Sequence, residues 1–240
     1  MSRKRALVPR NQPANDPPPG APRSAKGAKT RARLVEAAKL VFEETGFLDA
    51  RISDIAERAG ISHGSFYHYF ESKEQIFREV AAAQEALLTA PSVDGARGDG
   101  AAEAEDVDRS RVLTEFERLH RANRRYLERY RENARIMGVI EEVSRYDDLV
   151  NGARMGRQKH FAKQAEKSIR ELQKRGAADP DVDPKIAAVA LGSMVARFAE
   201  LWLVQGWEKF SFERAVDQIT LLWANAIGLR EPSKDPDRTS

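Results

Sequence analysis

Apolar residues recur at helical spacing along most of this chain. The first apolar face consists of Leu34, Ala37, Ala38, Val41 and Phe42. Residues three and four positions apart lie on one side of a helix, so this spacing predicts an amphipathic helix. Gly46 follows at the place where a left-handed glycine commonly ends a helix. Helical patterns of this kind recur through the chain and predict an all-α protein.

Two short helices are expected next. The apolar positions of the second helix are Ile52, Ile55, Ala56 and Ala59. Gly60 closes this helix, and Ser62 can cap a third helix over residues 63–70. Two short helices joined by a tight turn, with a longer helix ahead of them, form the pattern of a helix-turn-helix. The capping box Ser72–Gln75 then predicts a fourth helix with apolar positions up to Leu88.

The third helix has a polar face that would suit DNA. Phe66 and Phe70 lie four residues apart and are expected to point inward. The outward surface then consists of His63, Tyr67 and parts of Ser65 and His68. Flat or small polar groups of this kind can contact base edges in a major groove, where Gly64 would let the backbone approach closely.

Tyr69 and Lys73 follow this face, where they could reach a phosphate. Tyr69 has a second interpretation, in which its ring seals the motif against the fourth helix. His63 and His68 are five residues apart and no carboxylate completes a ligand set, so no metal site is predicted.

The remainder of the chain predicts a larger helical domain. Residues 91–108 are rich in Gly, Ala and Asp and indicate a connector. Helices resume at Ser110, with breaks expected at residues 146–148, 176–184 and 206–211. The predicted organisation is a disordered basic arm (1–26), a helix-turn-helix domain (27–75), a helical ligand-binding and dimerisation domain (76–230) and a disordered tail (231–240).

The last two helices are unusually apolar. Asp183-Pro184 and Ser211 are suitable start signals for them. Such an apolar surplus is typical of an interface, although the two helices could instead form the centre of one subunit's core. The predicted interface residues are Trp202, Ile219, Leu222 and Trp223.

Charge is divided unevenly along the chain. Residues 1–33 contain nine Lys or Arg and one acid, Asp16, which gives +8 and leaves −5 for the rest of a chain whose net charge is +3. A proline-containing basic segment of this kind could be a solubilising tail or an arm that binds a polyanion. Cysteine is absent, as expected for the cytoplasm. The apolar stretch 186–204 carries Arg197 and Glu200 and therefore indicates a buried helix and not a membrane span.

Residues 29–77 closely resemble the DNA-binding domain of the TetR (tetracycline-repressor-like) family. The resemblance is carried by Ala37-Ala38-x-x-Val41-Phe42, Gly46-Phe47, Asp54-Ile55-Ala56-x-x-Ala59-Gly60-Ile61-Ser62 and Phe66-Tyr67-His68-Tyr69-Phe70-x-Ser72-Lys73-Glu74. It implies a homodimer that regulates transcription, most often as a repressor, by binding double-stranded operator DNA. It also implies a C-terminal domain that binds a small inducer, and a four-helix bundle formed by the last two helices of each subunit.

The resemblance also assigns roles to individual residues. It implies base contacts for His63, Gly64, Ser65 and Tyr67, and phosphate contacts for His68, Tyr69 and Lys73. Ser53 and Arg51 begin the second helix, where the family usually contacts the DNA backbone through Thr or Ser, and Arg51 departs from that pattern. Lys29, Arg31 and Ser62 complete the predicted DNA-binding set.

Polar residues within apolar stripes, together with large apolar neighbours, predict an effector cavity in the C-terminal domain. The predicted lining residues are Phe116, His120, Asn123, Tyr126, Met137, Glu141, Phe161, Arg197 and Phe198. This composition favours a small hydrophobic effector with one polar group. Arg197 could bind that group or form an internal ion pair with Glu141 or Glu200, and His120 could instead donate to a backbone carbonyl.

No catalytic or cofactor motif accompanies these features: the sequence lacks a nucleophile elbow, a Gly-rich phosphate loop and a His-Glu-x-x-His pair. We therefore expect no enzyme, no cofactor and no metal. The alternatives are an architectural or constitutive DNA-binding protein without an inducer and, more remotely, a helical enzyme. The presence or absence of a cavity discriminates between the regulator and the architectural protein.

Overall fold

The computed structural model describes residues 25–89 and 113–229, and every regular element in these ranges is helical. The all-α prediction is therefore confirmed. The expectations for residues 1–24, the 91–108 connector and the 231–240 tail lie outside the described residues. The first helix begins at Ala25, so the last two residues of the predicted basic arm are helical.

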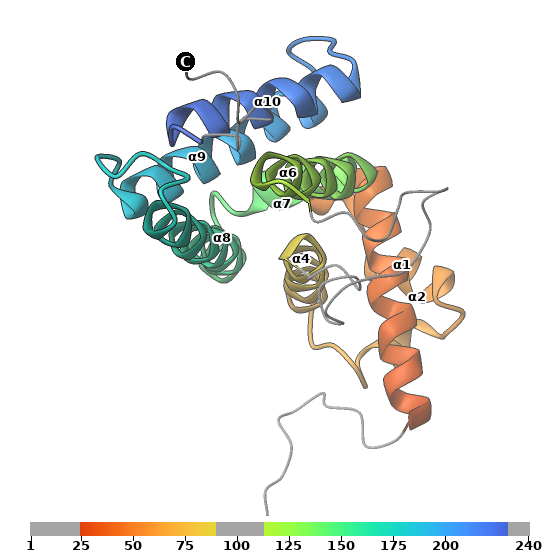
Figure 1. Cartoon of the computed structure of the whole chain (residues 1–240). Coiled ribbons are helices and arrows are strands. Elements are labelled where there is room, and N and C mark those ends of the chain that lie inside the picture. Colours follow the sequence, from red (N-terminus) through yellow and green to blue (C-terminus); the bar gives the residue numbers. More distant parts are fainter. Residues whose placement is uncertain (1–24, 90–112, 230–240) are drawn as a thin grey trace, which may run out of the picture.

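Four helices form the N-terminal part of the fold (Figure 1): α1 (Ala25–Asp49), α2 (Ile52–Arg58), α3 (His63–Phe66) and α4 (Lys73–Thr89). Gly46 has a φ of 77°, and α1 bends there. The bend lets Phe47 join Phe42 and Phe77 of α4 in an aromatic cluster with centroid separations of 4.9–5.9 Å. These rings hold α1 and α4 together.

The third helix is shorter in the structure than the sequence predicts. It ends at Phe66, and residues 67–69 continue as a turn. The amides of His68 and Tyr69 donate to carbonyls three residues earlier, at 3.2 and 2.9 Å, which tightens the chain after the helix.

The C-terminal part contains α6 (Glu115–Glu132), α7 (Ala134–Val143), α8 (Asp148–Lys174), α9 (Pro184–Ala199), the π-helical turn η1 (Glu200–Val204) and α10 (Phe212–Ala226). Capping side chains set several boundaries: Asp147, Asp183 and Ser211 accept hydrogen bonds from the first turns of α8, α9 and α10. The break between α6 and α7 at Asn133 carries no glycine or proline and was not predicted.

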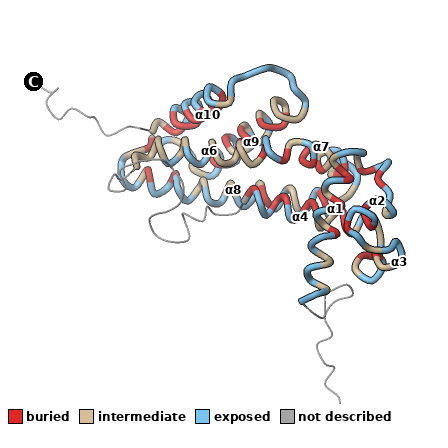
Figure 2. Tube along the Cα trace, turned by 90° about the vertical axis from the view of Figure 1, so that its right-hand side faces the viewer, coloured by how far each residue is buried: buried red, intermediate tan, exposed pale blue. Residues whose placement is uncertain are grey.

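Helix α4 connects the two parts of the molecule and lies between α1 and α8 (Figure 1). One core extends from Leu34 on α1 through Ile76 on α4 to Val216 on α10. A second core between α8, α9 and α10 includes Ile169, Leu191 and Trp223. The short helices α2 and α3 lie at the end of the molecule away from α10 (Figure 2).

Among the described residues, the continuous stretch Pro184–Val204 is long and apolar enough to cross a membrane by length and composition alone. Ala188, Leu191, Val195 and Ala199 on this stretch are buried against the rest of the chain. This packing is typical of a core helix.

Candidate DNA-binding face and effector cavity

Helix α3 presents an exposed polar face. Ser62 caps the helix by accepting a hydrogen bond from the Ser65 amide at 3.2 Å, and the two hydroxyl groups lie 2.8 Å apart. The rings of His63 and Tyr67 meet edge to face, with centroids 5.4 Å apart, and half of the Tyr67 side chain is exposed. Together they form an exposed surface that can donate and accept hydrogen bonds.

Buried rings beneath α3 fix the orientation of this face. Phe66 and Phe70 are both buried, in agreement with the inward direction predicted for them. Tyr69 is half-buried and packs against the same core, which corresponds to its sealing interpretation. The exposed residues around the face are Arg51, Ser53, Ser62, Gly64 and His68.

Lys73 does not present a free ammonium to DNA. Its Nζ donates to the carbonyls of Phe47, Leu48 and Ala50 at 2.7, 2.9 and 3.0 Å, and it lies 4.8 Å from the Phe47 ring centroid. An ammonium has three donors, and three carbonyls occupy them. This geometry corrects the prediction of a phosphate contact, since Lys73 fastens the end of α1 to the start of α4.

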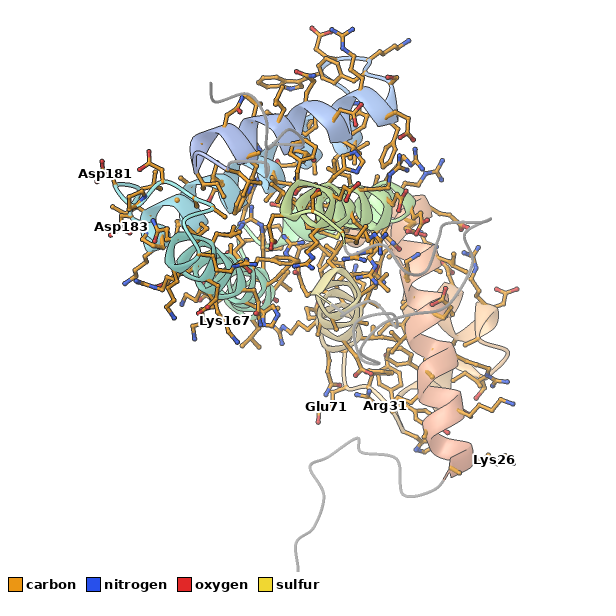
Figure 3. All side chains as sticks on the ribbon, viewed as in Figure 1. Lys26, Arg31, Glu71, Lys167, Asp181 and Asp183 are labelled. Carbon is orange, nitrogen blue, oxygen red and sulfur yellow. The ribbon has the colours of Figure 1, made fainter. Side chains whose placement is uncertain are left out.

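Arg31 is also occupied within the protein. Its guanidinium forms an ion pair with Glu79 of α4 and stacks 4.5 Å from the centroid of Phe70. Figure 3 labels Arg31 near the lower end of α1. The predicted DNA contact of Arg31 is therefore replaced by a contact between α1 and α4. Lys29 is exposed and remains a candidate for the DNA backbone.

A cavity of about 750 Å³ lies among α6, α8, α9 and α10. Its apolar lining includes Leu119, Ala122, Phe161, Ala165, Val195 and Ile227. Polar side chains occur near one end, at Asn123, Tyr126 and Arg157, and along the rim, at Glu115 and Arg175. Lys167, labelled in Figure 3, also lines the cavity. The volume is in the usual range for a drug-sized ligand.

Three of the nine predicted lining residues are present in this cavity: Asn123, Tyr126 and Phe161. Asn123 donates to the Thr220 hydroxyl at 3.2 Å, and the rings of Tyr126 and Phe161 meet edge to face with centroids 5.6 Å apart. Burial raises the pKa of Tyr126, so its hydroxyl stays protonated.

The polar residues predicted for the cavity but absent from its lining have partners elsewhere. The Nε2 atom of His120 lies 2.9 Å from a carboxylate oxygen of Asp217 on α10. Its partner is therefore a side chain, whereas a backbone carbonyl was predicted. Glu141 accepts from Arg154 at 2.6 Å. Arg197 forms an ion pair with Glu200, which is one of its two predicted internal partners.

The remaining predicted lining residues pack outside the cavity. Met137 is fully buried in the first core. Phe198 lies against Trp202 and Phe210, at centroid distances of 5.5 and 6.0 Å. Phe116 is half-buried on α6 and does not reach the lining.

The predicted interface residues differ in exposure. Ile219 and Trp223 are buried in the second core, and Trp223 lines the cavity, so they belong to the interior of the subunit. Trp202 is half-buried. Leu222 is 54% exposed on α10, beside exposed Leu221. Ile186 and Val189 expose apolar surface on α9. A dimer through these helices would therefore use their outer residues.

Arg157 is a functional candidate that the sequence did not reveal. It is buried on α8, lines the cavity, and its Nε lies 2.8 Å from Oε2 of Glu85 on α4. Burial holds the pKa of Glu85 above its usual value, although the neighbouring guanidinium acts in the opposite direction. The surrounding helical pattern is only weakly amphipathic, so nothing in the sequence distinguishes Arg157 from the many surface arginines.

Sequence comparison with known proteins finds matches in the N-terminal helices, and structural comparison extends the likeness to the C-terminal helices. The family model described as "Bacterial regulatory proteins, tetR family" matches residues 34–80, from α1 to the first half of α4. Residues 34–80 thus match the TetR family. The match contains the capped α3 and the buried rings beneath it.

Curated relatives match this chain over a similarly short stretch. The uncharacterized HTH-type transcriptional regulator YdgC of Bacillus subtilis is 49% identical over 55 residues, which are 23% of this chain and 28% of that protein. The HTH-type transcriptional repressor KstR2 of Rhodococcus jostii is 41% identical over 64 residues, 27% of this chain and 31% of that protein. The matches thus span less than a third of these two relatives.

Solved structures extend the likeness to the C-terminal helices. The transcriptional regulator FadR from Bacillus subtilis, crystallised in complex with stearoyl-CoA, superposes with a TM-score of 0.63. The alignment covers 82% of this chain and 98% of that one, at 16% identity. At this identity the comparison establishes a shared fold.

Proposed function

We propose that this protein is a ligand-responsive transcriptional regulator that acts as a repressor. In this proposal a homodimer binds a palindromic operator in the cytoplasm, and a small hydrophobic effector releases it. The two copies of α3 would lie about 34–36 Å apart, or a multiple of that distance, to enter successive major grooves.

The observation that carries the proposal is the presence of two features in one chain. The exposed face of Ser62, His63 and Tyr67 lies at one end of the molecule, and a cavity of about 750 Å³ opens between the C-terminal helices. Helix α4 contacts both parts, since it packs against α1 and against α8. A change at the cavity can therefore alter the orientation of the DNA-binding face.

Effector release requires a difference in affinity between two states. A ligand that fits the cavity better when α4 is displaced favours the displaced state by that difference and no more. Linkage then requires operator DNA to weaken ligand binding by the factor by which ligand weakens DNA binding.

The relatives support this class of function. KstR2 is named a repressor, and FadR was crystallised with stearoyl-CoA. Repression and stearoyl-CoA binding are stated for those two proteins and not for this chain. For this chain, the apolar and elongated lining favours a hydrophobic effector with a long chain.

An architectural DNA-binding protein without an effector is the second candidate. Such a protein has no need of a large apolar cavity beside its DNA-binding helices, so the cavity favours the ligand-responsive alternative.

The proposal can be tested with operator DNA recovered from a random pool by the full-length protein. Binding of labelled operator would be followed by fluorescence anisotropy during titration with a library of hydrophobic compounds. We expect at least one compound to release the DNA and to bind more weakly when operator is present. The absence of any selected sequence would contradict the regulator assignment, and a selected operator that no compound releases would support the architectural candidate.

A further inference from the structure

Arg157 is deeply buried and carries a hydrogen-bond donor for which the described residues offer no acceptor. Its side chain is 3% exposed and lines the cavity. Within the described ranges, its Nη1 atom is buried and lacks a hydrogen-bond partner. An unpaired buried N–H is unfavourable, so an occupant of the cavity that brings an oxygen atom to this donor is stabilised.

The neighbouring arginine on α8 lacks this property. Arg154 donates to Glu141 at 2.6 Å, is 24% exposed and does not line the cavity. The two residues lie one helical turn apart and both pair with a glutamate. Of these two arginines, Arg157 is the one that lines the cavity.

The shape of the cavity indicates what carries the oxygen atom. The α8 residues in its lining extend from Met155 to Leu172, which at 1.5 Å per residue is about 25 Å of helix. Between Arg157 and the rim pair of Glu115 and Arg175, the lining is mainly aliphatic and aromatic. A flexible hydrocarbon chain can follow such a cavity, whereas a compact ring system would fill only part of it.

We propose that Arg157 anchors the effector by donating a hydrogen bond to an acyl oxygen of a long-chain compound, with the hydrocarbon chain lying along α8. This inference rests on the proposed function and specifies its ligand. Glu85 already balances the charge of Arg157, so the oxygen can belong to a neutral ester or to a carboxylate. The chemistry shared by both is an oxygen acceptor at the end of an apolar chain.

The same contact explains how the ligand reaches α4. The Arg157 guanidinium lies 2.8 Å from Glu85, and Glu85 belongs to α4. A ligand oxygen that draws the guanidinium toward the cavity weakens this attachment of α4 to α8. Arg157 thus binds the polar end of the ligand and also positions α4.

Three probes of equal chain length test the anchor: dodecanoate, methyl dodecanoate and dodecane. Binding to the purified full chain would be followed by tryptophan fluorescence, because Trp223 lines the cavity. We expect Arg157→Lys to weaken the oxygen-bearing probes by about tenfold or more, and dodecane hardly at all. Arg154→Lys is the matched control and is expected to leave all three affinities unchanged.

A double variant, Glu85→Met with Arg157→Met, removes both buried charges and the donor while keeping apolar volume, so it retains a folded protein for the same titrations. It should bind dodecane as the wild type does and lose the preference for oxygen-bearing probes. Loss confined to dodecanoate or to methyl dodecanoate would identify the acid or the ester as the class of ligand, and either result supports the anchor.

Equal weakening of all three probes, or no weakening, would overturn the role of Arg157 while leaving an effector cavity in place. If none of the probes binds the wild type, the long-chain anchor is wrong, whereas the proposed effector as such fails only if the library titration also finds no ligand.

Discussion

The carboxylate of Asp147 joins Arg78 to the first turn of α8. One oxygen, Oδ2, accepts from Nε and Nη2 of Arg78 at 3.0 and 2.9 Å. The other, Oδ1, accepts from the amides of Leu149 and Val150 at 3.0 and 3.1 Å. Since Arg78 belongs to α4, a single side chain both caps α8 and holds it against the helix that leads to the DNA-binding face.

Asp147→Ala should destabilise the protein by about 1 kcal/mol at neutral pH, through loss of the cap and of the Arg78 contact. Burial acts to raise the pKa of Asp147, but the hydrogen bonds from Arg78 and the α8 amides hold it below its usual value. A depressed folded pKa contributes stability above the unfolded pKa and loses it as pH falls through the folded pKa.

Urea unfolding of wild type and Asp147→Ala at several pH values would measure this effect. The difference in unfolding free energy should be full at pH 7 and shrink below about pH 4. The neighbouring, exposed Asp148→Ala is the control and should show a smaller difference. If the difference in unfolding free energy between wild type and Asp147→Ala stayed constant down to acidic pH, the Asp147 carboxylate would not stabilise the fold through its charge.

Lys73→Met should destabilise the N-terminal helices by about 1–3 kcal/mol, because three carbonyls at the end of α1 lose their donor. Thermal unfolding of the purified variant measures the effect. Lys29→Met, at an exposed site on α1, should leave stability unchanged. If instead Lys73→Met unfolded like the wild type and only weakened binding to all DNA sequences, the phosphate-contact prediction would be right after all.

Leu222→Glu should separate the proposed dimer into folded monomers, because it places a charge among the exposed apolar residues of α10. Light scattering gives the mass, and circular dichroism confirms the helix content. Leu149→Glu changes a similarly exposed leucine on α8 and serves as the control. Dimers that persist in Leu222→Glu would place the interface on another surface. Trp223 is unsuitable for this test because it is buried.

Gly192→Leu should block the effector without disturbing the fold. Gly192 lines the cavity on α9, and an added Cβ would meet no atom within 4 Å among the described residues. Operator binding should persist while the hydrophobic probes lose affinity. Gly152→Leu, at an exposed and equally open position on α8, should change neither property. Unaltered probe binding in Gly192→Leu would place the ligand elsewhere.

The sequence was most informative where local chemistry decides the structure. Ser62, Asp183 and Ser211 each accept the expected capping hydrogen bonds. Phe66 and Phe70 are buried as their spacing requires. These features depend on residues a few positions apart, so a single sequence contains the information that specifies them.

The cavity was harder to predict because its lining depends on how distant helices face one another. His120 and Glu141 are polar residues on apolar stripes, yet they interact with Asp217 and Arg154 and do not line the cavity. Lys73 was misjudged for the same reason, since its carbonyl partners lie 23–26 positions earlier in the chain. Helical periodicity gives the direction of a side chain but not the partner that it meets.

The central claim is that the exposed surface of α3 reads a DNA sequence, and selection from a random DNA pool tests it most directly. The wild type should enrich an inverted repeat, and Tyr67→Ala should reduce discrimination against random DNA by about 1–3 kcal/mol for each base that the tyrosine reads. Tyr146→Ala, at an exposed tyrosine outside this face, should enrich the same sequence as the wild type. Enrichment of the same repeat by Tyr67→Ala with undiminished affinity would contradict the account.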